Sequence, residues 1–134
     1  MNPGTFRILV VLSIVLPLVA SAIDLLVGAG VPEALREAQQ EVDSERSAGA
    51  MTLQSGVAIA LLLVVLGAAW GLFMFRRWGR TLALVSSALA FAAWPFFGYG
   101  VYSGWAFGFM ELGSTVWGAV IALSYASAVA AEFK

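Results

Sequence analysis

Long apolar stretches separated by short charged segments dominate the hydrophobic pattern of this chain. The stretches that are long enough to cross a bilayer as α-helices cover residues 6–27, 55–75, 81–102 and 112–131. Because a hydrocarbon core of about 30 Å needs about 20 apolar residues per helix, each stretch supplies one span. The sequence therefore predicts an all-α fold, in which residues 1–134 form a single transmembrane domain built as an integral membrane four-helix bundle.

The first stretch has a second interpretation, because it also resembles a cleavable secretory signal. Arg7 precedes an apolar run, and Ala20, Ser21 and Ala22 are the small residues typical of a signal cleavage site. Apolar residues resume after Asp24 and make the stretch long enough to span. We therefore expect this stretch to be retained as the first membrane helix.

The connection between the first two spans has a pattern of its own. Pro32 stands at a helix start, and good helix formers follow it as far as Arg46, which predicts a short helix over 32–46. A thin apolar stripe, suited to a membrane surface or a partner, recurs at helical spacing and consists of Val31, Leu35, Ala38 and Val42. Acidic side chains stack on another face, where like charges repel, at Glu33, Glu37, Glu41 and Glu45. This acidic ladder fits a basic partner or a site that concentrates cations, but a simple solvated face is also compatible with it.

Charge in the connections predicts the orientation of the bundle. The turn between the second and third spans contains Arg76, Arg77 and Arg80 and no acid, whereas the 32–46 region is acidic. Since short cytoplasmic loops are enriched in Lys and Arg, we expect this turn, with Trp78, to anchor in the inner leaflet. Both termini then lie in the cytoplasm and the 32–46 helix is extracytoplasmic, which for a bacterial chain means a multi-pass protein of the inner membrane.

Composition narrows the function. The chain is 61% hydrophobic and 11% charged, with a mean hydropathy of +0.92, so lipid must cover much of its surface. It has no cysteine and no histidine, which removes thiol chemistry, the commonest metal ligand and the usual general base. A net charge of −1 argues against nucleic acid as a partner. We expect no enzymatic activity, no metal and no cofactor.

Polar and aromatic residues gather toward the predicted outer face. Asp24 and Glu111 fall near the outer ends of their spans, and the aromatic residues at this level include Trp94, Tyr99, Tyr102 and Trp105. The rings fit an interfacial belt, or else a pocket in which carboxylates and aromatic faces bind an organic cation. The pattern leaves open whether the two carboxylates converge, because Glu111 also fits the start of the fourth helix, where it would favour the helix dipole.

Glycines at steps of four predict close helix packing. The second span contains Gly67 and Gly71, and the outer end of the chain contains Gly100, Gly104 and Gly108. Such spacings let two backbones approach closely. We expect them to serve packing within the bundle, and a homo-oligomer interface is the alternative.

Three segments carry a resemblance to a known group of proteins: Ser21-Ala22-Ile23-Asp24-Leu25-Leu26, Phe75-Arg76-Arg77-Trp78-Gly79-Arg80 and Ser124-Tyr125-Ala126-Ser127-Ala128-Val129-Ala130. The chain resembles small uncharacterised four-span bacterial inner-membrane proteins, which implies the same arrangement of spans and no particular activity. Small multidrug transporters are similar in length and span number. They carry a glutamate deep inside the first helix, however, where this chain has only Asp24 near the outer end.

These observations favour a non-enzymatic membrane protein that works by protein–protein interaction at its outer face. An accessory subunit, an assembly factor and an immunity-type protein all fit this description. Besides the lipid bilayer, we expect a membrane-protein partner or a second copy of the chain. The alternative is a small transporter or channel for a cationic or amphipathic molecule, motivated by Asp24, Glu111 and the aromatic residues.

Overall fold

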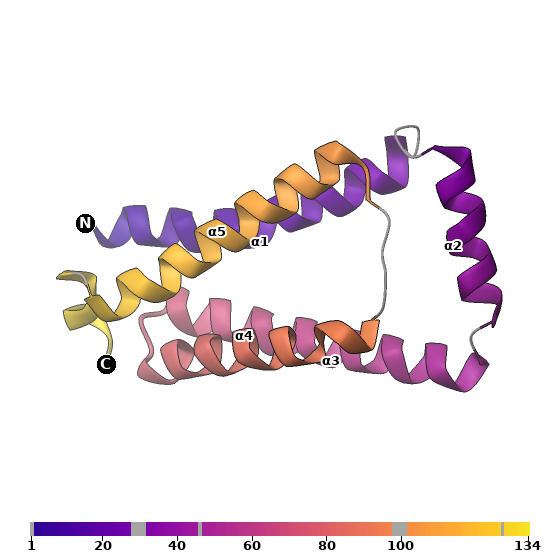
Figure 1. Ribbon diagram of the computed structural model, residues 1–134. Helices are drawn as coiled ribbons and strands as arrows, with labels where there is room; N and C mark the ends of the chain where they lie inside the picture. The colour runs from indigo at the N-terminus through magenta and orange to yellow at the C-terminus, as the bar shows by residue number, and fades with distance from the viewer. Residues whose placement is uncertain (1, 28–31, 46, 98–101, 127) are drawn as a thin grey trace.

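A computed structural model describes residues 2–27, 32–45, 47–97, 102–126 and 128–134, and the elements in this part are all helical (Figure 1). The elements are α1 (Pro3–Val27), α2 (Glu33–Glu45), α3 (Ala48–Phe73), α4 (Arg77–Phe97), α5 (Gly104–Ala126) and a short 3-10 helix, η1 (Ala128–Glu132). Among the described residues, α1, α3, α4 and α5 are long and apolar enough to cross a membrane. The predicted all-α fold with four candidate spans is confirmed.

Two of the long helices begin well before the apolar stretches that predicted them. α3 starts at Ala48 instead of residue 55, because the Ser47 side-chain oxygen accepts a hydrogen bond from the Ala50 N–H and caps the helix. α5 starts at Gly104 instead of residue 112, and Ser103 caps it through the Ala106 N–H in the same way. Capping and backbone hydrogen bonds determine where α3 and α5 begin. A charged or polar residue in the first turns therefore does not change the first residue of the helix.

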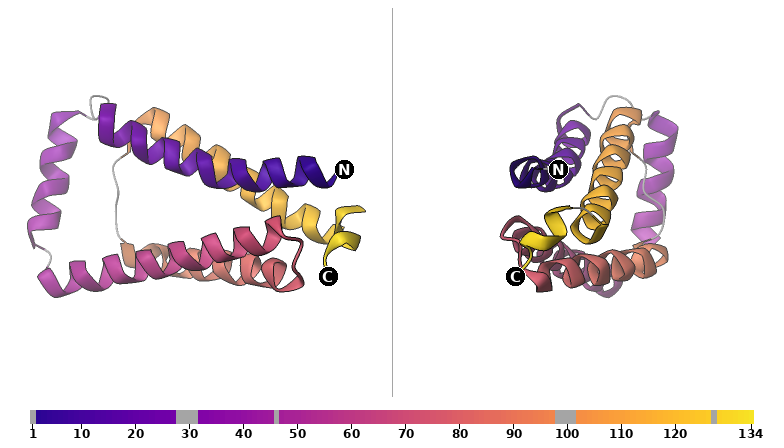
Figure 2. Two further views of the ribbon diagram at one scale, coloured as in Figure 1. Left: turned by 180° about the vertical axis from the view of Figure 1, so that it is seen from behind. Right: turned by 90° about the vertical axis from the view of Figure 1, so that its left-hand side faces the viewer.

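The long helices form two antiparallel pairs, α1 with α5 and α3 with α4 (Figure 1). The pairs converge at the end that holds both termini and the α3–α4 turn, and they diverge toward the opposite end (Figure 2). There α2 crosses from the end of α1 to the start of α3. We call the first end the terminal end and the second the α2 end.

Buried side chains concentrate at the terminal end. Phe6 and Leu72 are fully buried, and the rings of Phe6, Phe75 and Phe133 pack with centroids 5.3 to 5.8 Å apart. Elsewhere the long helices expose large apolar side chains, such as Phe91 at 84%. Although the sequence has more aromatic residues near the α2 end, the tight aromatic packing lies at the terminal end, where both helix pairs meet.

Glycines make the closest helix contacts. A Cβ atom added at Gly79 would collide with the Gly71 carbonyl carbon, so the backbones of α3 and α4 touch there. A Cβ atom added at Gly113 would lie 2.7 Å from Pro17 Cδ, where α5 meets α1. At Gly67, an added Cβ would make an ordinary van der Waals contact, 3.8 Å from Leu82 Cδ2.

The other predicted packing glycines do not make such contacts. No described atom lies within 4 Å of a Cβ added at Gly104 or Gly108 in α5, and Gly100 lies outside the described residues. Among the described residues, Gly104 and Gly108 therefore do not show the close packing that we expected from this spacing. Gly79 and Gly113 take that role, because helix rotation turns them, and not Gly104 or Gly108, toward a neighbouring helix.

Candidate functional site

The surface of α2 is uncovered along the described part of the helix. Leu35 and Val42 of the apolar stripe are each 49% exposed, and the side chains of Glu33, Glu37 and Glu41 are exposed too. Within the described residues, no hydrogen bond or ion pair engages these three carboxylates. The side chain of Glu45, like Val31, lies outside the described part. α2 therefore presents both apolar and acidic groups without using them to hold the bundle together.

Asp24 positions the start of α5. Its carboxylate oxygen accepts a hydrogen bond from the Ser103 backbone N–H at 3.1 Å, and Ser103 is itself buried. The Ser103 hydroxyl oxygen in turn accepts from the Ala106 N–H at 3.2 Å. Sequence reasoning did not single out Ser103, although a serine directly before a helical stretch is a recognised N-cap signal.

Glu111 does not join Asp24. It lies about two turns inside α5, and eight residues separate it from Ser103, which amounts to about 12 Å of helix axis. Two residues from Glu111, Gly113 packs on α1, so the Glu111 carboxylate lies on roughly the opposite face of α5 and is exposed. Asp24 and Glu111 therefore lie at different levels along the bundle, because α5 starts at Gly104, earlier than its apolar stretch indicated.

The aromatic residues of the predicted outer cluster are exposed where the structure describes them. Trp94 lies near the end of α4, while Tyr102 and Trp105 flank the start of α5. Tyr99 lies outside the described residues. Exposed rings at both helix ends are typical of a membrane interface, where tryptophan and tyrosine are enriched. No group of three or more acidic residues with the spacing of a metal site occurs among the residues that were placed.

The α3–α4 turn has a strained residue at its centre. The Arg76 N–H donates to the Gly71 carbonyl at 2.8 Å and the Phe75 N–H donates to the Leu72 carbonyl at 3.0 Å. This is the Schellman ending of a helix, whose left-handed position is usually glycine. Here it is Phe75, at φ 53°. The ring contacts with Phe6 and Phe133 offset the backbone strain, which costs about 1 to 2 kcal/mol.

Two arginines at the start of α4 hold the C-terminal segment. Arg80 Nη1 donates to the Ser124 carbonyl at 3.0 Å, and its guanidinium lies over the rings of Tyr125 and Phe133, 4.9 and 4.8 Å from their centroids. Arg77 Nε donates to the Phe133 carbonyl at 3.4 Å. Arg76 and Trp78 are exposed, as membrane anchors would be. The contacts of Arg77 and Arg80 could not be predicted, because their partners lie far away in the chain.

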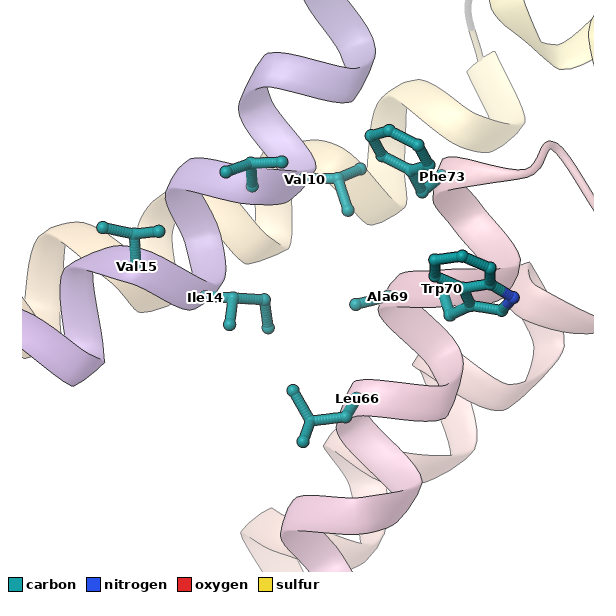
Figure 3. A pocket seen from close by; sticks show the side chains of 8 residues that line it. Val10, Ile14, Val15, Leu66, Ala69, Trp70 and Phe73 are labelled. Atoms are coloured by element: carbon teal, nitrogen blue, oxygen red, sulfur yellow. The ribbon is translucent and has the colours of Figure 1, made fainter.

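An apolar groove of about 300 Å³ lies between α1 and α3 (Figure 3). Its walls come from α1 residues Val10, Val11, Ile14 and Val15 and from α3 residues Leu66, Ala69, Trp70 and Phe73. Arg7 adjoins one end, where its Nε donates to the Phe73 carbonyl at 3.3 Å and its guanidinium lies 5.2 Å from the Phe73 ring centroid. No sequence signal marks this groove, because both wall segments are uniformly apolar.

No protein-family model, curated protein or solved structure matches this chain. The features of this chain that bear on its function are therefore the α2 surface, Glu111 and the groove.

Proposed function

We propose that this chain is a non-enzymatic, multi-pass membrane protein that acts by binding another protein through α2. The observation that carries the proposal is the exposure of both faces of α2. The described side chains of the apolar stripe and of the acidic ladder are exposed, so they contribute little to the packing of the bundle. Their combination is typical of a helix that docks onto a partner.

The orientation that we propose places α2 outside the cytoplasm. The turn with Arg76, Arg77 and Arg80 lies at the terminal end, and positively charged short loops favour the cytoplasmic side. Because α2 lies at the other end of the bundle, it would then be extracytoplasmic. In a bacterial host the chain would be a protein of the inner membrane.

The chemistry of α2 favours a partner with basic side chains beside an apolar patch. Neighbouring glutamates at steps of four repel one another by a few tenths of a kcal/mol each, and a basic partner would remove this cost. Leu35 and Val42 would supply apolar contact area. An accessory subunit, an assembly factor or an immunity-type protein would each use such a surface.

Site-specific crosslinking combined with co-purification tests this proposal. We would place a photoreactive residue at the exposed position Gln40 and a control residue at Leu63, an exposed position of α3. Irradiation of native membranes should give one dominant protein adduct from Gln40 and only lipid adducts from Leu63. The same protein should co-purify with the chain in mild detergent, as identified by mass spectrometry.

Charge variants make the crosslinking result specific to the acidic ladder. Combined Glu33→Gln, Glu37→Gln and Glu41→Gln should reduce the adduct severalfold, whereas Glu132→Gln, an exposed acid at the terminal end, should leave it unchanged. Adducts with lipid alone from Gln40, or an adduct insensitive to the three substitutions, would count against the proposal.

A second candidate, a small transporter for an organic cation, is favoured by the place of Glu111. Ionisable side chains inside membrane spans are costly and commonly belong to transport pathways. The co-purification also separates the two candidates. A retained small cation that is lost in Glu111→Gln would favour transport, and a retained protein that is lost in the α2 variants would favour binding.

A further inference from the structure

We propose that the α1–α3 groove is a binding site for an anionic phospholipid, with one acyl chain in the groove and the phosphate against Arg7. The inference goes beyond the proposed function, because the groove lies between the spans and Arg7 lies at the terminal end, away from α2.

The groove has the chemistry of an acyl-chain site. Val10 and Ile14 on α1 lie across from Leu66, Ala69 and Phe73 on α3, and the side chains between them are apolar (Figure 3). An empty groove would lose van der Waals contacts along both walls. In a membrane the groove borders hydrocarbon, so the abundant occupant is a flexible lipid chain.

Arg7 supplies the complementary charge at one end. Its guanidinium lies between the rings of Phe73 and Phe75, 5.2 and 5.1 Å from their centroids, and only its Nε is engaged, with the Phe73 carbonyl. Within the described residues no carboxylate pairs with Arg7. Its terminal N–H groups are therefore available for a phosphate, which a planar guanidinium binds through two parallel hydrogen bonds.

Phe73 joins the two parts of the proposed site. Its side chain forms part of the groove wall, and its ring and carbonyl hold Arg7. A phospholipid with its phosphate at Arg7 would therefore have a tail at the mouth of the groove without further rearrangement. A net negative headgroup is favoured over a zwitterionic one, because the positive end of the latter would face the arginines of this end of the bundle.

Fluorescence quenching of Trp70 in the full chain tests the proposal, since Trp70 lines the groove. Trp78, Trp94, Trp105 and Trp117 would be replaced by phenylalanine, and the protein would be reconstituted in vesicles that contain brominated phosphatidylglycerol or brominated phosphatidylcholine. The anionic lipid should bind about fivefold more tightly, as expected for one arginine near a membrane surface. Equal binding of the two lipids would overturn the proposal.

Matched variants separate the headgroup contact from the chain contact. Arg7→Gln should bring the preference close to onefold, whereas Arg36→Gln, which removes the same charge from α2, should leave it near fivefold. Leu66→Phe fills the groove and should reduce quenching by both lipids, whereas Leu63→Phe adds the same ring outside the groove and should not. A preference that survives Arg7→Gln, or quenching that survives Leu66→Phe, would contradict the assignment.

Two further measurements still test the proposal if circular dichroism shows that the Arg7→Gln variant does not fold. Arg7→Lys keeps the charge and should retain most of the preference. In the chain with native Arg7, about 1 M salt should weaken the preference, because salt screens exposed charges. A preference indifferent to salt would overturn the electrostatic part of the proposal.

Discussion

Gly71 and Gly79 bring the backbones of α3 and α4 into direct contact, and the contact leaves no room for even one methyl group. In a membrane, apolar burial does little to pull helices together, because lipid tails are as apolar as the side chains. Close van der Waals contact between backbones must then supply much of the attraction. A single added carbon at Gly79 therefore strains the α3–α4 pair.

Gly79→Ala should lower the free energy of unfolding by about 1 to 3 kcal/mol, because the new Cβ would collide with the Gly71 backbone and not with a side chain that can rotate away. Unfolding in mixed micelles with an increasing fraction of denaturing detergent, followed by circular dichroism, measures the change. Gly118→Ala is the control, since nothing lies within 4 Å of its added Cβ. Equal losses in the two variants would show that the contact is not decisive.

The Gly67 and Gly71 spacing illustrates how far a residue pattern predicts packing. It correctly indicates a face of α3 suited to close approach at Gly71, because small residues four apart share one side of a helix. It does not identify Gly79 as the partner of Gly71, although Ala83 follows Gly79 four residues later in α4 and is buried too. The partner across a helix contact is a property of two helices, and a pattern within one helix cannot specify it.

α5 shows that a sequence pattern also does not predict where a helix begins. A charged residue at Glu111 ends the apolar stretch, but the helix continues through it to Gly104, because each backbone N–H still finds a carbonyl partner. Ser103 and Asp24 then define the start by accepting hydrogen bonds from N–H groups that the helix cannot satisfy. Hydrophobicity predicts that the element exists, whereas capping determines where it begins.

Asp24→Ala should destabilise the protein by about 1 to 2 kcal/mol, because the buried Ser103 N–H would lose its acceptor. Asp24→Asn should cost less, since the amide oxygen can still accept. Unfolding in mixed micelles measures both, and faster hydrogen exchange at the Ser103 amide would locate the effect. Glu37→Ala, at an exposed carboxylate on α2, should change neither quantity, and a similar loss there would contradict the capping role of Asp24.

At the scale of the whole molecule, the antiparallel pairs place both termini beside the arginine turn and α2 at the opposite end. The cluster of Phe6, Phe75 and Phe133 joins three segments that are distant in the chain. Arg77 and Arg80 add contacts to the C-terminal segment. The terminal end is thus the packed end of the bundle, while the α2 end leaves its groups exposed.

The proposed orientation predicts a labelling pattern for the chain in a bacterial membrane, and the absence of native cysteine makes it simple to measure. In intact spheroplasts, a membrane-impermeant maleimide should modify Ser44→Cys on α2 but not Asn2→Cys or Glu132→Cys, and all three should react after permeabilisation. The reverse pattern would show that the chain has the opposite orientation in the membrane. Labelling of Asn2→Cys and Glu132→Cys from opposite sides would contradict an even number of spans.

By itself the sequence determined that the chain is helical, has four stretches long enough to span and carries a short polar helix between the first two. It could do so because bilayer thickness sets the length of a span, and because a helix satisfies its backbone polar groups without any partner. Only the tertiary structure decided that Asp24 meets Ser103 and not Glu111, that Gly113 packs on Pro17, and that Arg7 adjoins an apolar groove. These contacts depend on how each helix is rotated about its axis, and a helix surface that is apolar all round does not specify that rotation.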